Sequence, residues 1–428
     1  MEQPASRFAS LRLDRRVYIL GSAGLIRSVG RSATFVFLPL VLADVYHLSF
    51  VYIGALVAAI VPVSTLSFLA GGYLSDRHGR RPFAVFPSFV SVGVMLALWA
   101  FLDRGVLVVM GLWAVNSLFM GVTRPVQNAM IGDVTPPSLR VTAFGVQRVF
   151  TNTGFALSPA IGGLLATFYG LPSLFLFAGI TSAVEGVLLL FLLRESHAGS
   201  APRGRSAFAS LSSPFHDRLF VGVLVVLVGL SILMNQFGTP LSLFLGAVRA
   251  IPYSEFGLIY AVNGVLVVLL QLPISRVVER RRQYMAWMAT GAIAYGTSFL
   301  LFNAADAFPF YVGAMSLLTV GEDIVSPTQQ TLVASFSGED QRGSYFGAYS
   351  ATTNASRVVG PVVGTLLLGL GAAGSSILWG GMFGVSVLVA GGFLLLRREA
   401  RSRIRPRDGT PQGLPSVVDQ MLSGEPGP

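Results

Sequence analysis

The sequence contains no cysteine and no lysine, so all 30 of its basic residues are arginine. Without cysteine there is no disulfide, no thiolate metal ligand and no thiol nucleophile. Without lysine there is no Walker A lysine for ATP and no Schiff-base lysine for retinal or pyridoxal phosphate. No nucleophile–base–acid set and no metal-ligand spacing is present either. We therefore expect neither enzyme activity nor a cofactor.

Charge of either sign is also scarce. Charged residues make up 12% of the chain, against about 25% in soluble proteins, and the mean hydropathy is +0.68. About 20 apolar residues cross a bilayer as a helix, which predicts an all-α integral membrane protein with twelve transmembrane helices. The predicted spans are 17–43, 50–73, 83–102, 106–131, 141–168, 174–194, 219–247, 253–277, 285–303, 308–334, 343–370 and 375–397. The first span lacks a clear cleavage site, so we expect it to be retained.

The arginines fix the predicted orientation. If the N-terminus lies inside and the spans alternate, 23 arginines fall in inner segments and only Arg104 and Arg249 fall in outer loops. This bias follows the positive-inside rule. We therefore expect both termini in the cytoplasm and the protein in the cytoplasmic membrane. The formal net charge of +10 would then face anionic lipid, not nucleic acid.

An internal repeat divides the chain. Residues 125–163 match residues 327–365 at a constant offset, with identities that include Gln127/Gln329, Asn152/Asn354 and Pro159/Pro361. Two halves of equal topology are parallel repeats related by an axis along the membrane normal. We predict two pseudo-symmetric six-helix bundles in a monomer. Their expected bounds are 1–194 and 219–397, with a cytoplasmic linker at 195–218 and an arginine-rich, then disordered tail at 398–428.

The loop between the second and third spans carries a motif. Residues Gly72–Arg81 resemble the loop signature of the major facilitator superfamily, G-x-L-x-D-R-x-G-R-R. We expect Gly72 to let a neighbouring helix approach closely and Gly79 to permit a tight turn. The resemblance implies that Asp133 pairs with the arginines of this loop and closes the cytoplasmic side. The predicted cytoplasmic gate consists of Gly72, Asp76, Arg77, Gly79, Arg80 and Asp133.

Spans four, five and eleven carry further elements. Arg124-x-x-Gln127 resembles a proton-coupling element of superfamily exporters, and residues Gly154–Gly163 resemble the antiporter element G-x-x-x-G-P-x-x-G-G, with Ser158 at the second Gly. These resemblances point to the drug–proton antiporter branch. Small residues let helices pack closely and proline bends them. The residues predicted to serve helix packing and gating are Gly154, Pro159, Gly162, Gly163, Gly360, Pro361 and Gly364.

Eight ionisable residues fall within the spans: five arginines and three acids. Each costs roughly 3 kcal/mol or more in lipid, so each should face a cavity or a partner. The predicted substrate cavity is lined by Arg27, Arg31, Arg124, Gln127, Arg148, Asn235, Asn263 and Arg357. Arg27 and Arg31 share one helix face and could grip one anion. The alternative is structural pairing of these arginines, or of Arg357, with Glu322 or Asp323.

Proton coupling requires titratable groups, and arginine does not release its proton. Glu322 and Asp323 are the predicted coupling pair, with Glu185 ranked below them. The surplus of arginine favours an anionic substrate, whereas the exporter element favours amphiphilic, often cationic drugs, as in multidrug efflux. The predicted function is secondary active transport of a small organic solute by alternating access, with proton-coupled export preferred. The alternatives are an importer or exchanger of organic anions, and a non-transporting membrane sensor on the same scaffold.

Overall fold

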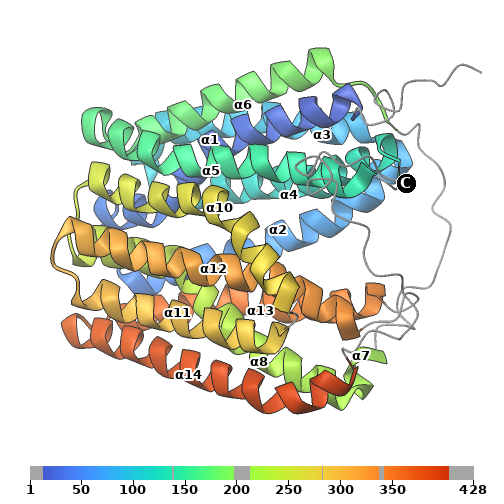
Figure 1. Cartoon of the computed structure of the whole chain (residues 1–428). Coiled ribbons are helices and arrows are strands. Elements are labelled where there is room, and N and C mark those ends of the chain that lie inside the picture. Colours follow the sequence, from blue (N-terminus) through green and yellow to red (C-terminus); the bar gives the residue numbers. More distant parts are fainter. Residues whose placement is uncertain (1–12, 137–138, 197–212, 282, 337–341, 404–428) are drawn as a thin grey trace, which may run out of the picture.

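The computed structural model describes residues 13–136, 139–196, 213–281, 283–336 and 342–403. Within these ranges all regular structure is helical and no strand occurs. The long helices run side by side, roughly parallel or antiparallel to one another (Figure 1). The predicted all-α class is thus confirmed. Residues 404–428, predicted to be a disordered tail, lie outside the described ranges.

Six long helices form the N-terminal half. They are α1 (Arg15–Asp44), α2 (Phe50–His78), α3 (Arg80–Ala100), α4 (Val106–Val134), α5 (Arg140–Tyr169) and α6 (Ser173–Leu192), with the short 3₁₀ turn η2 (Leu102–Arg104) between α3 and α4. Five of the six keep a proline inside the helix, as is tolerated in membrane helices where neighbouring groups satisfy the freed carbonyls.

The C-terminal half begins with the short helix α7 (Ser213–His216). Its first span is built from four pieces in succession: α8 (Arg218–Met234), η4 (Asn235–Phe237), α9 (Thr239–Leu243) and the π-helix η5 (Phe244–Val248). The other five spans are α10 (Tyr253–Arg281), α11 (Tyr284–Ala304), α12 (Phe308–Phe336), α13 (Arg342–Leu368) and α14 (Ala372–Arg403). α14 continues beyond the predicted end at 397, so the first residues assigned to the tail are helical.

Eleven of these helical segments are long and apolar enough to cross a membrane. The eleventh predicted span, 343–370, corresponds to α13, which is helical over 27 residues but is not among these eleven segments. It carries Arg357, Asn354 and many small or hydroxyl residues, which lower its hydropathy. A polar helix of this kind is stable in a membrane when it is enclosed by other helices.

The helices of each half pack on one another, and the two halves meet along two helix–helix contacts, which we call seams. In the N-terminal half α1 packs on α5 and α6, α2 on α4, and α3 on α4 and α6. In the C-terminal half α11 packs on α12 and α14, α10 on α12, and α8 on α13 and α14. The two seams between halves are α5–α10 and α2–α13.

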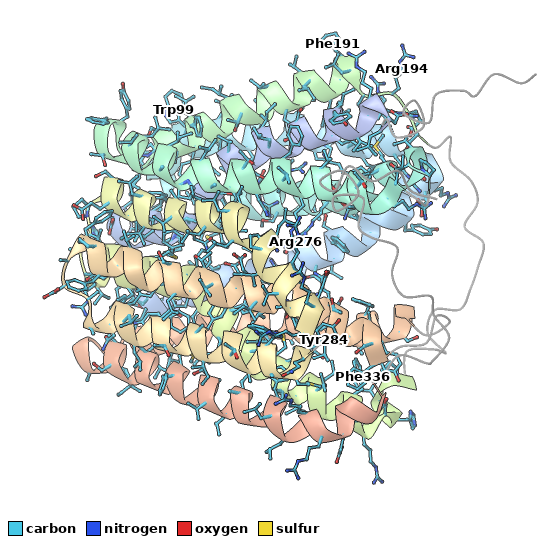
Figure 2. The ribbon with its side chains drawn as sticks, viewed as in Figure 1. Trp99, Phe191, Arg194, Arg276, Tyr284 and Phe336 are labelled. Carbon is cyan, nitrogen blue, oxygen red and sulfur yellow. The ribbon has the colours of Figure 1, made fainter. Side chains whose placement is uncertain are left out.

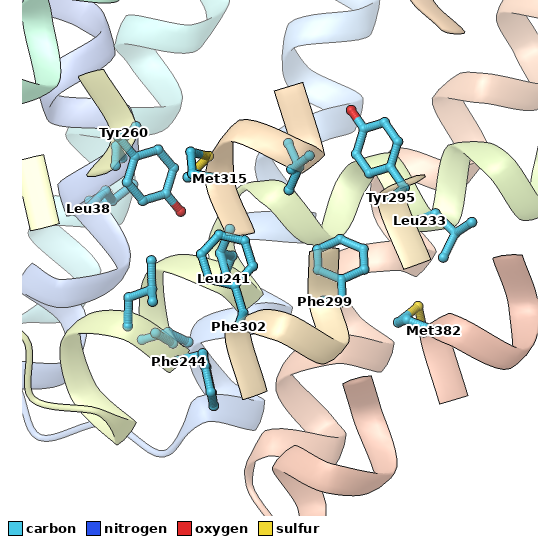
Figure 3. Close-up of a cluster of buried hydrophobic side chains, with 14 of the residues drawn as sticks. Leu38, Leu233, Leu241, Phe244, Tyr260, Tyr295, Phe299, Phe302, Met315 and Met382 are labelled. Atoms are coloured by element: carbon cyan, nitrogen blue, oxygen red, sulfur yellow. The ribbon is translucent and has the colours of Figure 1, made fainter. Parts of the chain in front are cut away.

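The interior and the surface are both apolar, as a membrane protein requires. A core of aromatic and aliphatic side chains includes Phe299 and Phe302 beside Leu241 and Phe244 (Figure 3), and Phe299 stacks on Trp379 with 5.0 Å between ring centroids. On the outside, Phe191 is 78% exposed (Figure 2). Such exposed large side chains suit contact with lipid rather than water.

The bundle has two distinct ends. Arg15, Arg80, Arg140 and Arg218 each begin a helix at one end, which we call the basic end. The opposite end holds the α1–α2, α3–α4 and α5–α6 turns and their counterparts in the second half. Arg194 marks the basic end in Figure 2, and Trp99 lies toward the opposite end.

Candidate functional site

The loop motif at the basic end forms an ion-pair network inside the N-terminal half. Arg80 pairs with Asp133 of α4 and with Asp76 of α2, the latter at 3.2 Å. Ser196 donates to Asp133 at 2.9 Å. The contact expected between Asp133 and Arg80 is therefore present. Arg77 is exposed and makes no ion pair with a described residue, so the pairing of Asp133 with both arginines does not occur in this state.

The glycines of the motif have different roles. Gly79 has φ of +89° between α2 and α3, the backbone geometry that glycine accepts without strain. The close helix approach expected at Gly72 is wrong, because a Cβ there would meet nothing within 4 Å. Its neighbour Gly71 makes that approach instead, where a Cβ would lie 2.8 Å from the Cα of Val122. Adjacent positions on a helix point about 100° apart, so only one of them can face α4.

A second network at the basic end was not predicted. The carboxylate of Glu195 accepts hydrogen bonds from the backbone amides of Arg80 and Arg81, at 3.1 and 3.0 Å, and so caps the start of α3. The Arg81 guanidinium in turn donates to the carbonyls of Leu193 and Leu190 at the end of α6, at 2.8 and 2.7 Å. The sequence placed Glu195 in the linker, and nothing in its local pattern marks it as a cap.

The start of α1 lies close to this network. Asp14 caps the helix by accepting from the backbone amide of Arg16 at 2.7 Å, and it also pairs with the Arg16 guanidinium at 2.8 Å. The hydrogen bond from that guanidinium lowers the pKa of Asp14 below its usual value. Arg16 also donates to the backbone carbonyl of Glu195 at 3.3 Å, so the ends of α1, α3 and α6 are tied together.

Arg27 is engaged at the middle of the N-terminal half. It donates to Glu185 of α6 at 2.9 Å and to Gln127 of α4 at 2.8 Å. Glu185 is completely buried. Arg27 is thus neutralised by Glu185, the acid ranked below Glu322 and Asp323 as a candidate for proton coupling. The predicted alternative that Arg27 pairs with Glu322 or Asp323 is wrong. Both terminal nitrogens of the Arg27 guanidinium are therefore already engaged within the N-terminal half.

Arg31 has a different environment one turn further along α1. Its side chain is exposed, and so are those of Arg124 on α4 and Arg357 on α13. None of the three makes an ion pair or a side-chain hydrogen bond with a described residue. Arg31 lies within electrostatic range of both Arg124 and Arg357, which are also within range of each other. The pairing of Arg357 with Glu322 or Asp323, considered from the sequence, is absent.

The two adjacent acids of α12 lie across from the N-terminal half. Glu322 accepts from Asn263 of α10 at 2.9 Å, and Asn263 also donates to Thr319 at 3.0 Å. Asp323 is 1% exposed, and its Oδ2 has no hydrogen-bond partner among the described residues. Both acids lie within electrostatic range of Arg148 on α5. Asn235 is not part of this group, because its amide donates to the carbonyl of Ser231 at 2.6 Å on its own helix.

The glycine elements of α5 and α13 lie at tight helix contacts. A Cβ at Gly154 would collide with the carbonyl of Leu25 on α1, and one at Gly162 would lie 2.8 Å from Ala33 Cβ on α1. Ser158 accepts from the Ala33 amide at 2.6 Å and donates to the Val29 carbonyl. Its hydroxyl thus bridges one turn of α1 beside Arg31.

The corresponding contacts of α13 face the first span of the second half. A Cβ at Gly360 would lie 2.9 Å from Asn235 Cβ, and one at Gly364 would collide with Gln236. Gln236 donates to the Gly360 carbonyl at 2.9 Å. Pro159 and Pro361 occupy equivalent places inside the two helices, as the repeat predicts.

The halves meet closely at the end opposite the basic end. A Cβ at Gly163 would collide with the Tyr253 carbonyl, and one at Gly257 with the Pro159 carbonyl. Tyr253 also donates to Asp44 of α1 at 2.6 Å. Phe37 packs edge-on against Phe256 with ring centroids 4.8 Å apart. The opposite end is therefore closed by backbone, polar and aromatic contacts between the halves.

Two six-helix halves that meet along two seams, with charged groups at mid-depth, are the architecture expected of a membrane transporter built from two repeats. The model of the Major Facilitator Superfamily matches residues 20–361 and 251–425, and the chain belongs to this superfamily. The predicted resemblance, including its drug–proton antiporter branch, is confirmed. The chain is a multi-pass membrane protein and a transporter of small molecules rather than an enzyme.

Individual relatives agree with this assignment. The class C tetracycline resistance protein of Escherichia coli is 28% identical over 376 residues, covering 86% of this chain and 91% of that protein. The Na(+), Li(+), K(+)/H(+) antiporter of Planococcus maritimus is 26% identical over 332 residues, covering 70% and 77%. The crystal structure of the nucleoside transporter NupG has a TM-score of 0.74 at 15% identity, covering 90% of this chain and 99% of that one, and shows the same fold.

Proposed function

We propose that this chain is a proton-coupled exporter of the cytoplasmic membrane, with its basic end and both termini in the cytoplasm. The distribution of arginine supports this orientation, because inner segments hold 23 arginines and outer loops hold two. The basic end would also contact anionic lipid. Relatives named as a resistance protein and as a cation/proton antiporter support export and proton exchange.

The single observation that carries the coupling proposal is Asp323. This carboxyl is buried at mid-depth in α12, and its Oδ2 has no hydrogen-bond partner within the described part of the chain. A buried carboxylate without a partner is costly, whereas the neutral acid is tolerated. Proton uptake and release at Asp323 therefore change the free energy of this site strongly, which is the property that a coupling group needs.

Glu322 and Arg148 extend the coupling site across the two halves. Arg148 belongs to α5 and stays charged, while the two acids belong to α12. When an acid is ionised, its attraction to Arg148 draws the halves together at this depth. When it is neutral, that attraction is lost. Protonation would thus shift the balance between inward-facing and outward-facing states by a difference in electrostatic energy.

The network of Arg80, Asp76 and Asp133 would serve as the cytoplasmic gate. In the present state its members pair within the N-terminal half. The end opposite the basic end, which we call the outer end, is closed by contacts between the halves. We propose that this is the inward-facing state. In the outward-facing state the exposed Arg77 and Asp76 would contact the C-terminal half and close the cytoplasmic side.

The test uses inside-out membrane vesicles in which an imposed pH gradient makes the lumen acidic. The panel contains tetracycline, carboxyfluorescein as an aromatic anion and ethidium as an aromatic cation. We expect the gradient to drive accumulation of at least one compound. Glu322→Gln with Asp323→Asn should abolish gradient-driven accumulation while downhill exchange of the same compound continues.

The matched control is Asp103→Asn, which removes an acid whose side chain is 80% exposed, away from the coupling site. It should leave gradient-driven accumulation unchanged. Wild-type accumulation that ignores the pH gradient, or full gradient dependence in the double variant, would contradict proton coupling at this pair.

A further inference from the structure

We propose that the transported substrate is an organic anion, bound between the halves by Arg31 and Arg124 from one side and Arg357 from the other. This inference rests on the proposed transport function and specifies its substrate class. It differs from the expectation that Arg27 and Arg31 act together, because Arg27 is already occupied by Glu185 and Gln127.

The first argument is the location of the three guanidinium groups. Each lies well inside a long helix, and each side chain is nevertheless exposed. An exposed arginine at this depth faces either lipid or a hydrated space between helices, and lipid is the costly choice. The three come from α1, α4 and α13 and lie within electrostatic range of one another. Side chains of separate helices that approach in this way face one another rather than the surrounding lipid.

The second argument is the lack of counter-charge. Of the three acids within the spans, Glu185 lies within electrostatic range of Arg31 but forms its ion pair with Arg27. The other two, Glu322 and Asp323, interact with Arg148. None of the five ion pairs between described residues includes Arg31, Arg124 or Arg357. Three like charges close together without a paired acid repel one another, so this place favours an anion and disfavours a cation.

The third argument is the division of the three arginines between the halves. Arg31 and Arg124 belong to the N-terminal half and Arg357 to the C-terminal half. Without a substrate they repel each other across the space between the halves. A carboxylate, sulfonate or phosphate accepts hydrogen bonds from guanidinium on more than one side. A bound anion would therefore replace repulsion with attraction and favour closure of the halves around it.

The test measures binding alone, without a gradient, so that its result is independent of proton coupling. The probes are carboxyfluorescein and ethidium, which are aromatic fluorophores of opposite charge. We expect purified wild-type protein to raise the fluorescence anisotropy of carboxyfluorescein saturably, and to do so for ethidium only at much higher concentration or not at all. Arg31→Gln or Arg357→Gln should weaken carboxyfluorescein binding about ten-fold or more, as for the loss of a charged hydrogen bond.

The matched control is Arg104→Gln, which removes the same charge from an outer loop where the side chain is 70% exposed, and it should bind as wild type does. Arg31→Lys should retain part of the affinity. If Arg31→Gln does not fold, Arg357→Gln in the other half gives the same reading. Saturable binding of ethidium without carboxyfluorescein, or equal anion affinity in wild type and both Gln variants, would overturn the anion site. Either result would leave the pH-gradient test unaffected.

Discussion

Arg27 and Arg31 lie one turn apart on α1, yet their surroundings differ completely. Arg27 donates to Glu185 and Gln127 within the N-terminal half, while the side chain of Arg31 is exposed and forms no ion pair with a described residue. The first residue is therefore part of the internal structure of the half, and the second is available to a ligand. Identical side chains at a spacing that places them on one helix face need not share a function, because the neighbouring helices decide what each one meets.

This difference predicts that loss of the Arg27–Glu185 pair lowers the stability of the protein, whereas loss of the Arg31 charge does not. Glu185→Gln leaves the Arg27 charge inside the half without its counter-ion, and removal of one member of such a pair costs about 3–5 kcal/mol. We expect a clear fall in the thermal unfolding midpoint of the purified protein. Arg31→Gln should unfold close to the wild-type temperature.

The double variant Arg27→Gln with Glu185→Gln is the control for this prediction. It removes both charges and should recover most of the lost stability. A double variant as unstable as Glu185→Gln alone would show that the ion pair is not the cause.

The sequence could identify the eight intramembrane charges but not their partners. Arg27 and Glu185 are separated by 158 residues, and no periodicity connects them. The pair exists because α6 packs on α1. The Arg80–Asp133 contact was predictable because a motif and a resemblance supplied its partner. The cap that Glu195 places on α3 had neither signal, so only the three-dimensional structure revealed it.

At the scale of single elements, α5 contacts two other helices, α1 and α10, through residues of one motif. Gly154, Gly162 and Ser158 face α1, while Gly163 faces α10 of the other half. Gly162 and Gly163 point in different directions because neighbouring helical positions are turned by about 100°. One short segment therefore fixes α5 within its half and also sets how closely the halves approach at the outer end.

Gly163→Ala tests the seam between the halves. The new Cβ would collide with the Tyr253 carbonyl, a backbone atom that cannot rotate away. We expect the outer end to open, with transport reduced at least several-fold and modest loss of stability. Transport in vesicles and the reactivity of a buried cysteine probe on α1, Val41→Cys, toward a membrane-impermeant thiol reagent measure the two effects.

The control is Gly145→Ala on the same helix, where a new Cβ would meet nothing within 4 Å. This variant should transport as wild type does and leave the outer end protected. Equal behaviour of the two alanine variants would show that the glycine contact at position 163 does not hold the outer end closed.

At the scale of the whole molecule, the fold was almost entirely predictable. The number of spans, the distribution of arginine and the internal repeat are properties of long segments. Errors of a few residues in the predicted span boundaries therefore do not change the predicted fold. The exceptions are local. The seventh span is broken at Asn235–Phe237 and ends in a π-helix, and α13 is less apolar than the other spans. Such details depend on packing against neighbouring helices, which single-sequence patterns do not encode.

The central claim is that the two halves rock about a binding site, so that one end opens while the other closes. The absence of native cysteine allows pairs of spin labels to be placed at chosen positions without background. Phe168→Cys with Phe310→Cys reports the outer end, and Tyr73→Cys with Val277→Cys reports the basic end; all four side chains are exposed. Trp99→Cys with Phe168→Cys lies within one half and serves as the control.

The measurement is the distance distribution of each pair by pulsed electron paramagnetic resonance, before and after acidification. The account predicts changes of opposite sign in the same protein: one of the two pairs lengthens while the other shortens, and the control pair does not move. Glu322→Gln with Asp323→Asn should abolish the response to acidification. Outer and basic-end distances that stay constant, or that lengthen together, would contradict transport by alternating access in this chain.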